Sequence, residues 1–433
     1  MTKASLAQWL GRLEQLHPRA VELGLERVGA VAATLGLLPL PQPVVTVAGT
    51  NGKGSVVAVL EALLGQTGRR AGAFTSPHLL RFNERIRVGA EEVPDEDIVA
   101  AFEAIERARG DISLTYFEFA TLAALLVFRQ RAPDIVILEV GLGGRLDSVN
   151  IVDASVAVIT SIDIDHQDWL GESRSEIALE KAGILRAARP AVIADPKPPA
   201  ALLARAAKLG AAPVLCLGRE FTLTVSTTGW QATLRTGTGA ARVLPPLPHG
   251  ALLPHNVCAA LQAALLLGVS YSDEQVVEAL RRARPHARRE AMSVAGRDYV
   301  LDVAHNPAAV VKLLEYICAT PCKGRTLALF SVMADKDIAG MTAAAAGRFD
   351  AWYLPDQPDN ARAASAADVA ALLRRQGQGA LSEHGDIARA LTSARTAMGA
   401  GDRLVIFGSF STVAAALALL EAEQGVDNAR SRP

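Results

Sequence analysis

The sequence predicts an α/β protein of two domains, built on doubly wound, mainly parallel sheets. Short β-branched runs alternate with longer segments of helical periodicity along most of the chain. At 433 residues, the chain is too long for one ordinary hydrophobic core. Half of the residues are hydrophobic but only 5% are aromatic, a balance that suits parallel sheets covered on both faces.

The larger sheet is expected from the first part of the chain, after helices between residues 5 and 38 that break near Gly24. Strands are expected at Pro43–Ala48, Ala71–Thr75, Ile135–Val140, Ser155–Ser161 and Ala191–Ala194. Helices are expected at Ser55–Gln66, Glu118–Arg129, Glu176–Arg186, Asn256–Leu267 and Asp273–Ala283. Residues 219–245 are rich in β-branched residues, Gly and Thr without a helical period, which predicts a small antiparallel patch.

A second α/β pattern begins near Met292. Its strands are expected at Tyr299–Val303, Thr326–Ser331, Ala351–Leu354 and Arg403–Phe407, with helices between them. The segment Arg284–Arg289 is the expected linker, so the predicted domains are residues 1–285 and 286–433.

Charge and hydropathy exclude several classes of partner. The formal net charge is −1, which argues against a general nucleic-acid binder. The N-terminus lacks the pattern of a signal peptide, and the apolar run around Ala259–Leu267 is too short to span a bilayer. We therefore expect a cytoplasmic protein without a membrane partner.

A glycine-rich loop follows the first strand and precedes a helix. Its residues are Gly49, Thr50, Asn51, Gly52, Lys53, Gly54 and Ser55. Backbone N–H groups and a helix N-terminus in this arrangement bind phosphate groups, and a lysine adds positive charge. The glycine and serine spacing departs from the common phosphate-loop pattern. The alternative is a tight structural turn, although the flanking strand and helix favour a nucleotide site.

Three candidate metal ligands occupy the carboxyl ends of predicted strands. They are Ser76, Glu139 and His166. An open α/β sheet places its ligand crevice at this edge, and magnesium prefers oxygen ligands, often with water and substrate phosphates. Taken singly, Glu139 is equally consistent with a loop cap and His166 with a turn residue. Their shared location at the strand ends favours a metal site.

Lys181, Asp302 and His305 are less clear from the residues alone. Lys181 lies on the expected helix Glu176–Arg186, where a solvated lysine is the simpler interpretation. Asp302 and His305 follow a predicted strand and stand beside Asn306-Pro307, a helix start. Helix capping explains Asn306 but not the other two side chains.

Together these motifs resemble the bacterial bifunctional dihydrofolate synthase/folylpolyglutamate synthases of the Mur ligase superfamily. The resemblance covers nearly the whole chain. Its segments are Leu23–Val28, Val47–Ser55, Thr75–Leu79, Asp111–Glu118, Ile137–Asn150, Asp165–Gly171, Glu180–Ile184, Asp302–Pro307, Asp335–Ile338 and Gly408–Phe410.

The resemblance implies a large phosphate-loop (P-loop) ATPase domain, a smaller C-terminal Rossmann-like domain and ATP bound at their junction. The implied reaction joins dihydropteroate to L-glutamate and then adds glutamates to reduced folates. An acyl phosphate would form on the substrate carboxylate, and ADP and phosphate would leave. A monomer with small-molecule substrates is expected.

Site residues follow from the same resemblance. Catalytic roles fall on Lys53, Lys181 and His305, with Lys181 carbamylated beside a second magnesium ion. ATP contacts fall on residues 49–55 and on Asn256, Arg288 and Asp302; the first magnesium falls on Ser76, Glu139 and His166. The dihydropteroate segments are Glu22, Leu23, Gly24 and Leu25; Thr115, Tyr116, Phe117 and Glu118; and Leu146, Asp147 and Ser148. Ser409 is a weak candidate for glutamate.

One departure and several alternatives stay open at this point. The family often has Pro-Gly-Arg where this chain has His286-Ala287-Arg288, so the nucleotide arginine is either Arg288 or Arg289. The alternatives are a folylpolyglutamate synthase without dihydropteroate activity, a Mur-type cell-wall ligase, and a nonenzymatic nucleotide-binding protein. The segment Leu23–Val28 favours the bifunctional enzyme.

Overall fold

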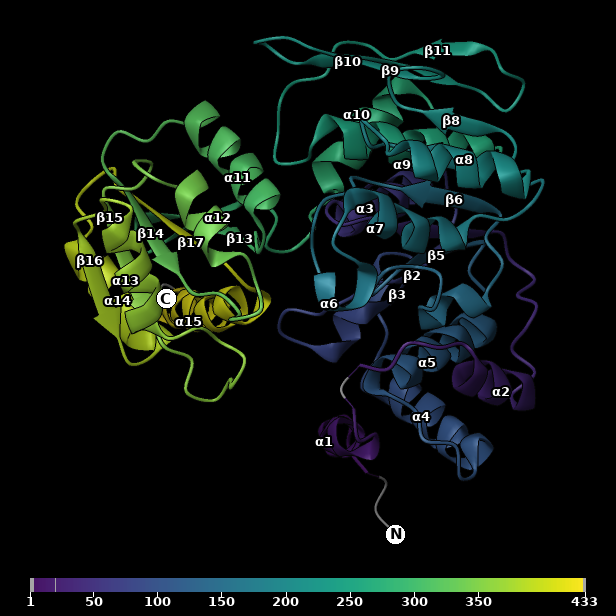
Figure 1. Cartoon of the computed structure of the whole chain (residues 1–433), viewed down its shortest axis with the longest axis horizontal. Helices are drawn as coiled ribbons and strands as arrows, with labels where there is room; N and C mark the ends of the chain where they lie inside the picture. The colour runs from purple at the N-terminus through teal and green to yellow at the C-terminus, as the bar shows by residue number, and fades with distance from the viewer. Residues whose placement is uncertain (1–3, 20, 431–433) are drawn as a thin grey trace. The chain divides into compact units, whose positions relative to one another are not determined.

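A computed structural model of the chain describes residues 4–19 and 21–430, with backbone alone for residues 425–430. The chain divides into two compact units, Met1–Pro285 and His286–Pro433. Each unit has its own sheet, as Figure 1 shows. No helix in the described part of the chain is long and apolar enough to cross a membrane.

The first unit is organised around an eight-stranded sheet of order β4-β3-β2-β5-β1-β6-β7-β8. Its strands are β1 Val44–Ala48, β2 Ala71–Phe74, β3 Ile86–Val88, β4 Glu91–Glu92, β5 Ile135–Glu139, β6 Val156–Ile159, β7 Ala191–Ile193 and β8 Val214–Cys216. All neighbours pair in parallel except β2–β3 and β3–β4. The predicted mainly parallel sheet is confirmed, but β3, β4 and β8 escaped prediction because two or three residues show no clear periodicity.

Helices cover both faces of this sheet (Figure 1). They are α1 Leu6–Leu16, α2 Glu26–Thr34, α3 Lys53–Gln66, α4 Asp95–Arg109, α5 Tyr116–Arg131, α6 Gln167–Leu170, α7 Arg174–Lys181, α8 Ala200–Leu209, α9 Pro254–Leu266 and α10 Asp273–Arg282. Successive residues of β1 alternate between two hydrophobic clusters: Val44 packs with one cluster and Val45 with the other. Burial on both faces explains why the strands are almost wholly apolar.

The predicted antiparallel patch is a separate three-stranded sheet of order β11-β10-β9. Its strands are β9 Thr222–Val225, β10 Trp230–Arg235 and β11 Ala241–Val243. Trp230, Ala232 and Leu234 alternate along β10 and are buried in the same cluster as α9. Side chains that alternate between two faces explain why this segment shows no helical period.

The second unit has a six-stranded sheet of order β12-β13-β17-β14-β15-β16. Its strands are β12 Glu290–Val294, β13 Arg297–Asp302, β14 Thr326–Phe330, β15 Ala351–Pro355, β16 Leu381–His384 and β17 Arg403–Phe407. Its helices are α11 Pro307–Ala319, α12 Ile338–Ala344, α13 Ala366–Arg375, α14 Ile387–Ala397 and α15 Phe410–Arg430. Only β12 runs antiparallel to its neighbour, which confirms a second mainly parallel α/β sheet.

Helix α7 ends five residues before the predicted end at Arg186. The chain passes into a short 3-10 helix, Ala182–Ile184. A Cβ on Gly183 would lie 2.3 Å from the Cα of Arg145, so only glycine permits this close approach of two backbones. The tight contact places Lys181 at the end of the helix.

Candidate active site

The glycine-rich loop lies at the carboxyl end of the central strand β1. Gly49 has φ 155°, and a Cβ there would come within 1.7 Å of the Thr160 side-chain hydroxyl. The amide of Thr50 donates to the carbonyl of Ser161 at 2.7 Å. The loop is therefore fixed against the end of β6, and glycine is required at its first position.

Lys53 and Asn256 both lie at this loop. The Lys53 ammonium donates to the carbonyls of Gly49 at 3.0 Å and Thr50 at 3.3 Å. A Cβ on Gly52 would lie 2.5 Å from both amide heavy atoms of Asn256, which comes from α9, far along the chain. The glycine-rich loop and Asn256 of α9, both predicted to bind the nucleotide, are therefore in contact.

Ser76 and Glu139 meet at the same edge of the sheet. The amide of Ser76, after β2, donates to Glu139 Oε2 at the end of β5, at 3.2 Å. A Cβ on Gly54 would be 3.8 Å from that oxygen, so the carboxylate lies beside the start of α3. His166 follows β6 with a left-handed φ of 54°, and its amide donates to Asp165 Oδ1 at 2.9 Å.

Ser76 and Glu139 bring oxygen donors together, which suits a hard cation that keeps water and phosphate ligands. Within residues 4–19 and 21–430, no group of three or more His, Cys, Asp or Glu side chains is arranged to hold a metal by itself. One hydroxyl, one carboxylate and one imidazole leave the remaining positions to water and substrate oxygens, as magnesium sites usually do.

Lys181 is buried, so its interpretation as a solvated lysine is wrong. Burial and the nearby positive charge of Lys53 lower its pKa to about 7, although Asp165, Asp147 and Glu180 act in the opposite direction. A lysine with this pKa is about half neutral amine at pH 7. The structure thus brings a reactive amine into electrostatic range of the phosphate loop.

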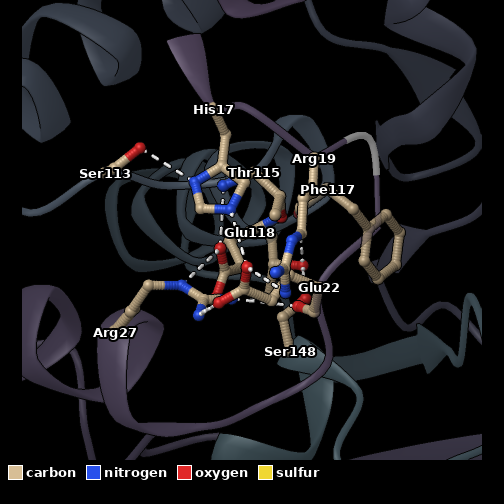
Figure 2. A network of polar contacts seen from close by, with 10 residues as sticks. His17, Arg19, Glu22, Arg27, Ser113, Thr115, Phe117, Glu118 and Ser148 are labelled. Atoms are coloured by element: carbon tan, nitrogen blue, oxygen red, sulfur yellow. Dashed lines mark hydrogen bonds and ion pairs between the residues drawn. The ribbon is translucent and has the colours of Figure 1, made fainter.

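The three segments predicted to bind dihydropteroate come together in the first unit. The amide of Gly24 donates to the carbonyl of Leu146 at 3.2 Å. The Thr121 hydroxyl, in α5, lies 2.6 Å from that of Ser148. Figure 2 shows the side chains that join these segments.

Arg27 is the centre of the network in Figure 2. Its guanidinium pairs with Glu22, and it also reaches Glu118 Oε1 at 3.2 Å. His17 Nε2 lies 3.2 Å from Glu22 Oε2, while its Nδ1 lies 2.8 Å from the Ser113 hydroxyl. Glu118 Oε2 also accepts the Thr115 amide at 2.8 Å in the capping box of α5. The buried Glu118 carboxylate therefore both caps the start of α5 and holds Arg27 of α2.

Comparison with known proteins places the chain in a family. Residues 47–220 match the Mur ligase middle domain, and residues 287–410 match the Mur ligase glutamate ligase domain. The dihydrofolate synthase/folylpolyglutamate synthase of Escherichia coli K12 is 42% identical over 419 residues, 97% of this chain and 96% of that protein. The chain belongs to the dihydrofolate synthase/folylpolyglutamate synthase family.

Solved structures agree with this assignment. E. coli FolC in complex with DHPP and ADP has a TM-score of 0.91 at 40% identity, covering 97% of this chain and 99% of that one. The Yersinia pestis bifunctional enzyme complexed with AMPPNP and Mn ion has a TM-score of 0.87 at 40% identity, covering 96% and 98%. The family, the fold class and the class of ATP-dependent ligase predicted from the sequence are confirmed.

In the second unit of this synthase-family chain, Asp302 ends β13 and holds the linker. Its carboxylate accepts the Arg289 amide at 2.9 Å and the Ala304 amide at 2.7 Å. The Arg288 guanidinium lies 5.2 Å from the ring centre of Phe410, whereas the Arg289 side chain is buried over a tyrosine ring. Arg288 is therefore the more accessible of the two arginines.

His305 and Ser409 lie at the carboxyl ends of neighbouring strands, β13 and β17. His305 Nδ1 is 2.8 Å from the Val303 carbonyl, which fixes the hydrogen on that nitrogen, and its ring is 6.2 Å from that of Phe410. The Ser409 hydroxyl is buried and lies 2.7 Å from the Thr412 hydroxyl. Both side chains stand at the edge where an α/β sheet binds ligands.

Sequence reasoning missed three charged residues of the first unit: His17, Arg27 and Arg85. Arg27 was inside a segment that the resemblance already singled out, and its pairing with Glu118 was not visible because 91 positions separate them. Asp147 was identified, but not its role in the loop: it accepts the Leu142 amide at 2.8 Å, and burial raises its pKa to about 6.

Proposed function

We propose that this chain joins L-glutamate to 7,8-dihydropteroate and adds further glutamates to reduced folates, with ATP converted to ADP and phosphate. Likeness to the E. coli dihydrofolate synthase/folylpolyglutamate synthase over 97% of the chain supports the overall activity. The observation that carries the dihydropteroate half is the meeting of residues 22–25, 115–118 and 146–148 in one place. We assign the ATPase role to the first unit and the glutamate-ligase role to the second.

Amide formation from a carboxylate requires activation, because charge and resonance repel a nucleophilic amine. A carboxylate oxygen attacks the γ-phosphorus of ATP, the bond to ADP breaks, and an acyl phosphate results. The glutamate amine then adds to the acyl carbon, loses a proton and expels phosphate. Positioning and charge neutralisation supply most of the catalysis in such phosphoryl transfers.

The phosphate loop performs the first task in this proposal. Backbone amides of Gly49–Ser55 face the phosphates, and Lys53 moves from the loop carbonyls to a phosphate oxygen. Asn256, packed against Gly52, holds the adenosine side of the loop. We also assign nucleotide contacts to Arg288 and Asp302, and an assisting role to His305.

Magnesium is the proposed metal, with Ser76, Glu139 and His166 as its protein ligands and Lys181 near a second ion. A bound magnesium ion would draw charge from the transferring phosphoryl group. The hydrogen bond from the Ser76 backbone amide to Glu139 supports this proposal, because it keeps the two residues side by side. We propose that Lys181 is carbamylated, which turns a costly buried cation into an anion suited to a metal neighbour.

Substrate dependence of ADP release tests the proposed function. The purified chain should release ADP only with ATP, L-glutamate and either dihydropteroate or a reduced folate. Turnover with tetrahydrofolate alone would identify a folylpolyglutamate synthase without dihydropteroate activity. Turnover with UDP-linked cell-wall precursors, or with no acceptor at all, would contradict the proposal.

A further inference from the structure

Arg85 is a buried arginine that the described site does not yet use. It ends the short 3-10 helix Phe82–Arg85, immediately before β3, and only 8% of its surface is exposed. Its carbonyl accepts the Thr75 amide at 2.9 Å, which ties it to the end of β2. Arg85 is thus fixed at the edge of the sheet where Ser76 begins its loop.

The side chain is held in place by only part of its guanidinium group. Arg85 Nε donates to His78 Nδ1 at 2.7 Å, and the guanidinium lies 5.6 Å and 5.5 Å from the ring centres of Phe82 and Tyr116. Its two terminal nitrogens make no hydrogen bond or ion pair with any described residue. Both terminal nitrogens keep some surface that is exposed to solvent.

Glu139 and Glu84 are the carboxylates that act on the charge of Arg85, but neither forms an ion pair with its guanidinium. Glu84 accepts three backbone amides, from residues 79–81, each at 2.6 Å. Arg87, two positions further, offers a contrast, because it pairs with Glu61 at 2.9 Å and donates to Thr75 Oγ1 at 3.1 Å. A buried arginine without a carboxylate partner is costly, so an anionic ligand is the expected partner of Arg85.

The surroundings of Arg85 define the kind of anion. Tyr116 belongs to a segment assigned to dihydropteroate, and the Phe117 ring beside it lies 5.7 Å from that of Phe74. A Cβ on Gly141 would be 2.6 Å from the Phe117 ring, so this ring covers the chain just after β5. Aromatic side chains beside an open guanidinium suit an aromatic ring that carries a carboxylate.

We propose that the terminal nitrogens of Arg85 bind the aryl carboxylate of dihydropteroate, the group that accepts the phosphoryl group. The proposal rests on the proposed function and adds a catalytic residue to it. Two anions, the carboxylate and the γ-phosphate, must approach each other, and the guanidinium offsets their repulsion. Arg85 stays protonated throughout, while a carboxylate oxygen forms the bond to phosphorus and ADP leaves.

A carboxylate-to-carboxamide comparison tests this role. Affinity is measured for dihydropteroate and for its carboxamide in wild type, Arg85→Gln and Arg85→Lys. Arg81→Gln, at the exposed start of the same 3-10 helix, is the matched control. Wild type should prefer the carboxylate by about tenfold to a hundredfold, the range for hydrogen bonds to charged groups. Arg85→Gln should bring the preference to about twofold or less, Arg85→Lys should retain part of it, and Arg81→Gln should leave it unchanged.

Kinetics and folding separate this role from a structural one. In Arg85→Gln, kcat/KM for dihydropteroate should fall about a hundredfold while the KM for ATP stays within about twofold. Added guanidinium ion should restore part of the activity of Arg85→Ala. If Arg85→Gln fails to fold, Arg85→Lys decides, because it keeps the cation and the aliphatic stem.

An unchanged carboxylate preference in the folded Arg85 variants would overturn the role of Arg85 and leave the proposed function standing. The absence of dihydropteroate turnover in wild type would instead overturn both. The two failures are therefore distinguishable.

Discussion

Removing dissolved CO2 is expected to lower the ligase activity of this enzyme, because the carbamate that we propose on Lys181 would be lost. The amine is buried beside the positive charge of Lys53, and its pKa falls to about 7. Only the neutral amine attacks CO2, so a low pKa favours the reaction. The carbamate is anionic, which also removes the cost of burying a cation near Lys53.

The size of the effect follows from the pKa. At pH 7.5 an amine with a pKa of about 7 is about three-quarters neutral, whereas one at the usual 10.5 is only about 0.1% neutral. The site therefore raises the reactive fraction by roughly three orders of magnitude. At a fixed CO2 concentration, carbamate formation should decline as the pH falls through about 7, since protonation removes the reacting form.

The assay follows ADP release with dihydropteroate and glutamate in CO2-free buffer, then after bicarbonate is added. Wild type should lose most of its activity in CO2-free buffer and regain it when bicarbonate is added. With 13C-labelled bicarbonate, NMR should show a carbamate signal. Lys181→Ala should be at least about a hundredfold slower and indifferent to bicarbonate, as expected when a metal-orienting group is lost. Lys208→Ala, on exposed α8, is the control and should behave as wild type.

Two results together would refute this reasoning: full activity of wild type in CO2-free buffer, and a near-normal rate for Lys181→Ala. Loss of activity in Lys181→Ala without any bicarbonate response in wild type would retain a role for the lysine and reject the carbamate.

Two further predictions concern the backbone. Gly49→Ala should weaken ATP binding by at least about tenfold, because its Cβ would collide with the Thr160 hydroxyl at 1.7 Å; isothermal titration measures this, and affinity within twofold of wild type would contradict it. Ala295 and Gly296 both have positive φ in the exposed turn between β12 and β13. Ala295→Asn should stabilise the second unit by about 0.5–1 kcal/mol, because such turns favour Asn-Gly. Urea unfolding measures the gain, Ser293→Asn in the adjoining strand should show none, and equal midpoints for wild type and Ala295→Asn would contradict the prediction.

Much of the fold was predictable because the central strands are buried on both faces. Val44–Ala48 and Ile135–Glu139 show the apolar runs that such burial demands, and the loops after them carry the polar site. The edge strands were not predictable: β4 has only two residues, both exposed, and its place depends on pairing with β3. Pairing of this kind is a tertiary property that a local pattern does not contain.

The site was predictable where one segment carries the chemistry and not where distant segments share it. The phosphate loop consists of seven consecutive residues, so its pattern can be read directly from the sequence. Glycine is required at position 49 because a Cβ there would collide with Thr160. Burial of Lys181 depends on packing at Gly183, so local spacing favoured a solvated lysine. Arg85 escaped notice for a similar reason, since the lack of a carboxylate partner is visible only once every neighbour is placed.

Transfer of 18O from the dihydropteroate carboxylate to phosphate tests the central claim most directly. Both carboxylate oxygens are labelled, the chain is supplied with ATP and L-glutamate, and the released phosphate is analysed by mass spectrometry. Activation by phosphoryl transfer predicts one labelled oxygen in each phosphate, because the acyl carbon–oxygen bond breaks when glutamate attacks. Phosphate without label, formed alongside dihydrofolate, would contradict an acyl-phosphate route.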